Sequence, residues 1–261
     1  MSLLLYGIIS SEPDPPRTGS WRLPRGVDGA PVYLVEAGTL RAIVSRVVRS
    51  TATATIARAL AYARVVDAVH ADRAIVPMRY GCVVREARQV IELLHTRAEE
   101  YARVLQAVDG CVEMGIRLLA DRAEPATHAT FPLDDVRVPG GVFARGAGMA
   151  YLARRQRIYD DQDRKVREVE AQLERLRAVF SGWFVRCRAE CPPAAPVGPV
   201  LPAHAFALHF LLKREWLPSF RQAFRRIDRA QRSRLLLSGP WPPYNFVGPE
   251  RVANSFTDPQ L

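Results

Sequence analysis

SGPWPPYNFV, residues Ser238–Val247, is the most constrained stretch of this 261-residue sequence. Its three prolines and Gly239 leave the backbone few conformations, so the segment is stiff before the chain folds. Trp241, Tyr244 and Phe246 add large contact areas at a low cost in side-chain entropy. A stiff aromatic segment of this kind is suited either to lock two domains together or to dock a partner. The sequence leaves both roles open, and locking is the simpler one.

A second constrained stretch, Val76–Gly81, reads VPMRYG. Pro77 is compatible with a strand only at a sheet edge or a bulge, because proline cannot donate a ladder hydrogen bond. Packing of a strand does not by itself require an arginine between this proline and an aromatic–glycine pair. We expect a bent strand in which Arg79 is held in a structural ion pair.

The first 120 residues are predicted to form one α+β domain. Short apolar runs closed by turn residues predict strands, and apolar residues three and four apart predict helices. Helices that pack on one face of such a sheet give a two-layer sandwich of the ferredoxin-like style. The expected strands are Leu3–Ile9, Val32–Glu36, Leu40–Val48, Ile75–Val84 and Cys111–Leu119, and the expected helices are Thr55–Ala71 and Ala87–Val108.

A second α+β domain is predicted over residues 148–261, after a linker at 121–147 that is rich in proline and glycine. It begins with a long helix, Met149–Phe180, whose apolar residues keep a coiled-coil-like spacing. This helix either packs on its own sheet or binds a partner. The remaining elements expected are the strands Trp183–Cys187, Ala205–Leu212 and Ser233–Leu237 and the helix Glu215–Ala230.

The charge of the chain is strongly basic, with a formal net charge of +10 and a pI of about 10. Of its 37 basic residues only Lys165 and Lys213 are lysines, so 35 are arginines. A basic surface attracts any polyanion without selecting one. The four cysteines fit a reducing cytoplasm, and we expect neither a secretory signal nor a membrane-spanning segment.

Residue patterns that would carry catalysis or bind a metal are weak. The glycines between 140 and 148 lack the spacing and the preceding strand of a dinucleotide-binding loop. Cys187 and Cys191 together with His204 and His209 offer zinc ligands in principle, but two histidines five apart on a strand point to opposite faces. We therefore predict no enzyme activity, no catalytic residue, no cofactor and no metal site.

Six stretches together resemble the GvpF/GvpL family of gas vesicle proteins. In chain order they are LYGII (Leu5–Ile9), GTLRAIVS (Gly38–Ser45), VPMRYG, VEMGIR (Val112–Arg117), GMAYLAR (Gly148–Arg154) and SGPWPPYNFV. The resemblance implies a ferredoxin-like domain followed by a modified one. It also implies a minor structural or assembly protein in the cytoplasm, at the gas vesicle. Such a protein would bind the small apolar wall protein and other accessory proteins, and would prevent aggregation of the wall protein while a vesicle nucleates.

The residues of these motifs are structural or interface candidates, since the family has no catalytic residues to carry over. They are Pro77, Arg79, Tyr80, Gly81, Tyr151, Leu152, Gly239, Pro240, Trp241, Pro242, Pro243, Tyr244 and Phe246. The sequence does not separate the F from the L subtype, or a stable wall component from a transient assembly factor.

Two other functions remain open from the residues. A ferredoxin-like sheet binds RNA when aromatic residues stud an open face, and here Tyr6 and Tyr33 are the aromatic residues on the strands of the first half. The core-strand consensus of RNA-binding domains is lacking, and most arginines fall on the predicted helices. An enzyme of unknown type would require a deep pocket lined by perturbed acids or histidines.

Overall fold

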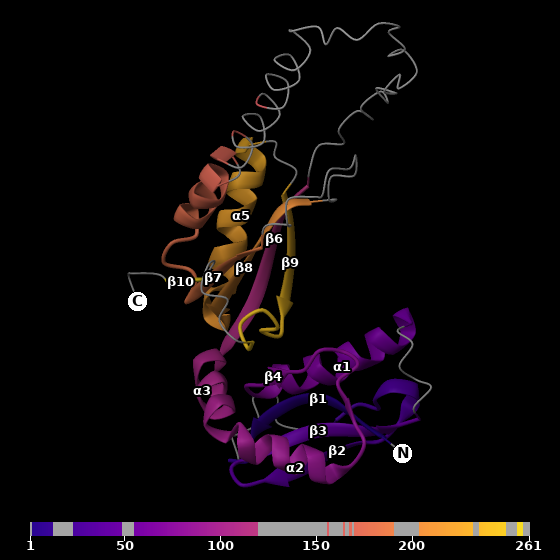
Figure 1. The fold of residues 1–261 in the computed structure, drawn as a ribbon. Coiled ribbons are helices and arrows are strands. Elements are labelled where there is room, and N and C mark those ends of the chain that lie inside the picture. Colours follow the sequence, from indigo (N-terminus) through magenta and orange to yellow (C-terminus); the bar gives the residue numbers. More distant parts are fainter. Residues whose placement is uncertain are drawn as a thin grey trace, which may run out of the picture.

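The computed structural model contains two antiparallel sheets with helices packed against them (Figure 1). It describes residues 2–12, 23–48, 55–119, 170–190, 204–231, 235–248 and 255–257, and the separate positions 156, 164, 167 and 168. The expected linker at 121–147, with Tyr151 and Leu152 of the next motif, lies outside the described residues. Within those residues no helix is long and apolar enough to cross a membrane.

The first sheet is built around β1, an almost wholly apolar strand. Its strands are β1 (Ser2–Ser10), β2 (Val32–Ala37), β3 (Leu40–Val47), β4 (Val76–Pro77) and β5 (Val83–Val84). They lie in the order β2-β3-β1-β4, and β5 pairs with the same strand β1 nearer its start. Every pair is antiparallel.

Helices cover both faces of this sheet, so the expected two-layer sandwich with helices on one face is wrong. Helix α1 (Ile56–Asp72) packs its Tyr62 and Val66 against one face. Helices α2 (Ala87–Thr96) and α3 (Ala98–Val108) cover the other (Figure 1). The physical reason lies in β1, where alternate residues enter opposite cores and all are apolar.

The expected helix Ala87–Val108 is in fact two helices that meet at Arg97, where the backbone leaves the helical region with φ −115° and ψ 23°. The break changes the direction of the chain between them. Leu94 of α2 and Leu105 of α3 still enter the same core cluster beneath β1 and β3. The continuous apolar periodicity over residues 87–108 therefore indicates a buried face that two helices share, and not one straight helix.

The strand Cys111–Leu119, expected to be the last strand of the first domain, belongs to the second sheet. Its strands are β6 (Cys111–Leu119), β7 (Arg186–Glu190), β8 (His204–Lys213), β9 (Leu235–Trp241) and β10 (Ser255–Thr257), in the order β10-β7-β8-β6-β9. The chain passes from the first sheet to the second at Gly110, whose φ of +67° suits glycine. The expectation that this strand joins the first sheet is thus wrong, because β6 pairs with β8 and β9.

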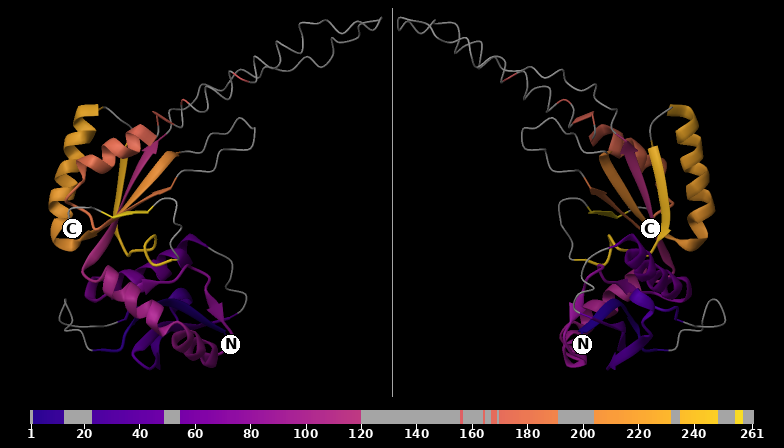
Figure 2. Two further views of the ribbon diagram at one scale, coloured as in Figure 1. Left: turned by 60° about the vertical axis from the view of Figure 1, so that its left-hand side comes forward. Right: turned by 90° about the vertical axis from the view of Figure 1, so that its right-hand side faces the viewer.

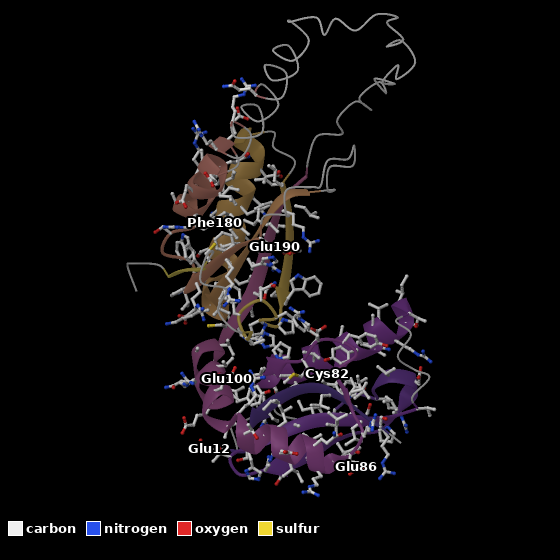
Figure 3. The ribbon with its side chains drawn as sticks, viewed as in Figure 1. Glu12, Cys82, Glu86, Glu100, Phe180 and Glu190 are labelled. Atoms are coloured by element: carbon white, nitrogen blue, oxygen red, sulfur yellow. The ribbon has the colours of Figure 1, made fainter. Side chains whose placement is uncertain are left out.

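One face of the second sheet is covered by helices, as Figure 2 shows from two sides. The short 3-10 helix η3 (Arg214–Trp216) leads into α5 (Leu217–Gln231), and helical residues 170–179 lie beside α5. Phe180, labelled in Figure 3, stacks on Phe220 with ring centroids 4.3 Å apart. Phe210 of β8 packs against both rings and completes this aromatic core. The described end of the expected long helix thus packs on its own sheet.

Candidate functional site

The SGPWPPYNFV segment begins as the end of β9 and continues as a loop between the second sheet and helix α1 (Figures 1 and 2). Gly239 has φ +108° and is followed by a cis peptide bond to Pro240. A Cβ atom at Gly239 would lie 2.7 Å from the carbonyl oxygen of Glu113, which is closer than real Cβ contacts come. Only glycine therefore fits the irregularity at which the β6–β9 register shifts, between the pair Gly115–Ser238 and the pair Glu113–Trp241.

Glu113 of β6 anchors the loop to the sheet. Its side chain is 4% exposed, which is rare for a carboxylate unless it is paired. Oε2 accepts the backbone N–H of Asn245 at 2.9 Å, and Oε1 accepts the Asn245 side-chain amide at 2.6 Å. Charge-assisted bonds of this kind are about twice as strong as neutral ones. Glu113 thus fixes both the backbone and the side chain of one motif residue.

Further polar side chains extend this anchor across the same face of the sheet. His209 of β8 places Nδ1 3.1 Å from Glu113 Oε1, and its Nε2 lies 3.4 Å from Glu190 Oε2. Arg188 of β7 donates to the carbonyl oxygen of Asn245, and its guanidinium lies 5.6 Å from the ring centre of Phe246. A polar cluster thus holds the loop, and its members are Glu113, Arg188, Glu190, His209 and Asn245. Both carboxylate oxygens of Glu113 are occupied by protein groups, so the geometry suits anchoring and not proton transfer to a substrate.

Beyond Asn245 the segment reaches the first sheet and its helices. Phe246 is buried in a small apolar cluster with Val108 of α3 and Leu211 of β8. Val247 also packs against the core beneath α2 and α3. Because the cluster combines side chains from both halves of the chain, the loop occupies the junction of the two sheets. Arg214 adds a polar link, donating to the carbonyl oxygen of His70 at the end of α1.

Two aromatic residues of the motif remain on the surface at this junction. Trp241 is 47% exposed and Tyr244 is 37% exposed, whereas Pro242 and Pro243 are buried. Desolvation raises the pKa of Tyr244, and the nearby carboxylates of Asp67 and Glu113 raise it further. The phenol therefore stays neutral at physiological pH and presents a polar tip on an apolar ring. Buried prolines thus support an exposed aromatic pair.

The VPMRYG stretch bends between β4 and β5 and contacts Tyr62 of α1. Pro77 pairs with Gly7 at the sheet edge, and Tyr80 packs edge-on against Tyr62 at 5.3 Å between ring centres. The Tyr62 hydroxyl donates to the carbonyl oxygen of Met78 at 2.7 Å. Gly81 has φ +91°, which few other residues adopt. These contacts explain the bend through backbone geometry and packing.

Arg79 does not fulfil its expected role. Its side chain is exposed, and no ion pair to it occurs within the part of the chain that the structure describes. The bend is instead held by Tyr62, whose desolvation raises its phenol pKa, with a further contribution from Tyr244.

The polar cluster was missed from the sequence, although one signal was present. Glu113 is the carboxylate of a mostly apolar strand, inside the VEMGIR stretch. A buried charge in such a place needs a partner, and no local pattern identifies that partner as Asn245, 132 residues away. The zinc arrangement considered above does not form from Cys187 and His209, since Cys187 enters the apolar core while His209 faces Glu113.

Comparison with known proteins gives consistent matches along the chain. The family model described as gas vesicle synthesis protein GvpL/GvpF matches residues 2–248. Gas vesicle protein F of Streptomyces sp. (strain CB03234) is 27% identical over 251 residues, which cover 95% of this chain and all of that protein. Gas vesicle protein L of the same strain is 26% identical over 199 residues, covering 73% of this chain and 68% of that one.

Solved structures agree on the fold. The crystal structure of GvpF from Anabaena sp. PCC7120 superposes with a TM-score of 0.65 at 18% identity, covering 95% of this chain and 97% of that one. GvpF from Microcystis aeruginosa gives 0.64 at 17% identity, covering 95% and 99%. At these identities the likeness supports the mixed α+β fold.

Proposed function

This chain belongs to the GvpL/GvpF family of gas vesicle proteins, and from that premise we propose that it is a minor structural or assembly protein of the vesicle. It binds the small apolar wall protein and other accessory proteins, and it keeps the wall protein from aggregating while a vesicle nucleates. It does so in the cytoplasm, without catalysis and without a cofactor. The observation that carries the proposal is the family match over residues 2–248, which spans both sheets and the junction.

The exposed aromatic pair supplies a physical basis for this role. A wall protein with exposed apolar surface needs a binder that offers apolar contact area. Trp241 and Tyr244 offer such area on a backbone fixed by Gly239, the buried prolines and Glu113. A preformed aromatic anchor loses little conformational entropy on binding, so more of its contact energy appears as affinity. Locking the two sheets and docking a partner are thus compatible roles for one segment.

Nucleic-acid binding through the first sheet is not favoured by the arrangement of its aromatic residues. Tyr6 is fully buried beneath α1 and donates or accepts a hydrogen bond with Ser45. Tyr33 packs into the cluster beneath α2 and α3. Bases stack on aromatic rings that stand on an open sheet face, and helices cover both faces here.

Flotation of gas vesicles tests the proposal and separates its two forms. The chain is co-expressed with the wall protein, intact vesicles are floated, and the washed vesicles and the soluble fraction are probed for it. Retention through high salt and mild denaturant would identify a tightly bound vesicle component. Recovery with wall protein only in the soluble fraction would identify an assembly factor. Absence of any association with wall protein or vesicles would contradict the proposal.

Trp241→Ala tests the docking role of the motif directly. We expect a loss of about 2 kcal/mol of binding, roughly thirtyfold in affinity, as for a central aromatic anchor. The measurement is the amount of wall protein that co-purifies with each variant at matched expression. Trp183→Ala is the matched control, because Trp183 is similarly exposed and lies outside the motif. Equal co-purification by the two variants would exclude Trp241 from the docking surface.

A further inference from the structure

Strand β9 forms one edge of the second sheet, and Figure 1 shows it as the outermost strand. It pairs with β6 on its inner side, and within the described residues no strand pairs with its outer side. The backbone of β9 makes no other hydrogen bond in that part of the chain. In an antiparallel pair every second residue turns its N–H and C=O groups away from the partner strand. The outer side of β9 therefore presents unpaired donors and acceptors.

The other sheet edges carry features that discourage pairing with a further strand. Strands β4 and β5 are two residues long, and β10 is three residues long. The apolar side chains of β2 are partly buried in the two cores of the first sheet, and Glu36 on β2 is charged. By contrast, the stretch Leu235–Ser238 of β9 contains neither a charge nor a proline, and Leu236 is 47% exposed. Proteins usually protect an edge of this kind, so an exposed one is a candidate binding site.

Both faces of this edge are apolar. Leu235 and Leu237 are partly buried against the aromatic core on the helix-covered face. Leu236 lies opposite Arg117 and points to the other face, because successive side chains of a strand alternate. An occupant must satisfy the backbone groups and also meet apolar side chains on both faces. An extended apolar segment does both, whereas a helix has already used its backbone groups internally.

The edge leads to the aromatic pair proposed above as the docking site. Trp241 is the last residue of β9, three positions beyond Ser238 and so about 10 Å further along the strand. A segment of the wall protein that pairs with Leu235–Ser238 and continues beyond Ser238 meets the exposed ring of Trp241. The backbone pairing and the aromatic contact therefore belong to one continuous binding site.

A second copy of this chain fits the edge less well than the wall protein. Each copy carries a net charge of +10, so two copies repel each other on approach. Antiparallel pairing of two Leu235–Ser238 stretches about a twofold axis would also place the two Trp241 residues at opposite ends of the paired stretch. The paired stretch itself would be about 14 Å long and about 10 Å high, or about 140 Å² for each copy, against about 800 Å² for each partner in a stable interface.

We propose that the outer edge of β9 binds the wall protein by strand addition. An extended apolar segment of the wall protein pairs with Leu235–Ser238 through backbone hydrogen bonds, and its continuation packs on Trp241. The identity of the partner rests on the proposed function, and the inference adds the mode of binding. Backbone hydrogen bonds hold the segment, and the leucines on both faces of the edge select apolar residues.

Leu236→Lys tests the edge, because a lysine on an edge strand opposes pairing with a further strand. Leu236 is exposed, so the variant should fold, which circular dichroism and thermal unfolding check. We expect the amount of co-purified wall protein to fall at least about tenfold. Val179→Lys is the matched control, since Val179 is 48% exposed and lies on the helical residues that cover the same sheet. Unchanged capture by Leu236→Lys, or equal losses in both variants, would overturn the proposal.

Hydrogen exchange on the wild-type chain gives a second readout that does not depend on a variant. Amide exchange of residues 235–238 is compared residue by residue, with and without the wall protein. Strand addition protects the two outward amides, which belong to alternate residues, and we expect their exchange to slow at least about tenfold. Equal slowing at all four amides, or no slowing at any, would contradict strand addition.

A photo-crosslinking residue in place of Leu236 reports the occupant. Crosslinks to alternate residues of one wall-protein segment support the proposal. Crosslinks at three- and four-residue spacing, or only to a second copy of this chain, overturn it.

The two proposals fail in different ways. If the wild type captures no wall protein, the proposed function fails and the binding mode fails with it. If the wild type captures wall protein and Leu236→Lys captures as much, the function stands and the assignment of the β9 edge is wrong.

Discussion

The two sheets of this chain differ in how their second face is closed. The first sheet is apolar on both sides, with α1 on one face and α2 and α3 on the other. In the part of the chain that the structure describes, helices cover one face of the second sheet, while the other face carries Glu113 and His209 and is closed by the motif loop. Apolar packing tolerates many partners of similar volume, whereas a buried polar cluster accepts one arrangement of donors and acceptors. The polar face is therefore where the position of the loop is specified.

The largest expected effect tests the apolar face of the second sheet. Phe210 is fully buried and lies 5.2–5.4 Å from the ring centres of Phe180, Phe184 and Phe220. Phe210→Ala removes most of that packing and leaves a cavity, so we expect the free energy of unfolding to fall by about 3–5 kcal/mol. Urea unfolding followed by tryptophan fluorescence measures it. A loss below about 1 kcal/mol would show that the aromatic core contributes little.

An intermediate effect is expected on the polar face. Glu113→Ala removes the carboxylate that accepts both amide groups of Asn245 and contacts His209, and we expect a loss of about 1–3 kcal/mol in the free energy of unfolding. Hydrogen exchange at the Asn245 N–H should also become faster. Glu190→Ala is the control, because the Glu190 side chain is 67% exposed and the substitution removes only its 3.4 Å contact with His209.

A double exchange sharpens this test. Asn245→Asp alone places a second carboxylate 2.6 Å from Glu113 and should release the loop by repulsion. Adding Glu113→Gln restores an amide facing a carboxylate, and should recover much of the stability. Failure of the double variant to recover would mean that the pair does not act as a hydrogen-bonded unit.

The smallest expected effect concerns a surface ion pair where α2 meets α3. Arg97 donates to Glu100 at 2.7 Å, and this hydrogen bond lowers the pKa of the Glu100 carboxyl. Both side chains are about 40% exposed, so Glu100→Gln should cost less than about 0.5 kcal/mol. Because the pKa of Glu100 is lowered in the folded state, the ion pair adds to the free energy of unfolding above the ordinary carboxyl pKa of 4.5. This stabilisation is lost as the pH falls below 4.5 and through the lowered pKa. Thermal unfolding at pH 7 and at pH 3 checks both statements.

Helices and strands were largely predictable because their signals are local. The apolar run Leu3–Ile9 and the spacing of Tyr62, Val66 and Val69 each report a face that a single element must bury. The role of Gly239 and its neighbours as a rigid segment was likewise evident from residue types. By contrast, the break at Arg97 has no such residue signal, since it carries neither proline nor glycine.

The sequence by itself determined the mixed α+β class, the family resemblance and the stiffness of the motif, all of which follow from the order of residue types along the chain. The tertiary structure decided which sheet receives β6, which faces the helices cover, and that Glu113 meets Asn245. Strand pairing and buried hydrogen bonds join residues far apart in the chain, as when β6 pairs with β8. The spacing of apolar residues along the chain does not say which distant segments pair. Only the folded chain brings residues such as Glu113 and Asn245 together.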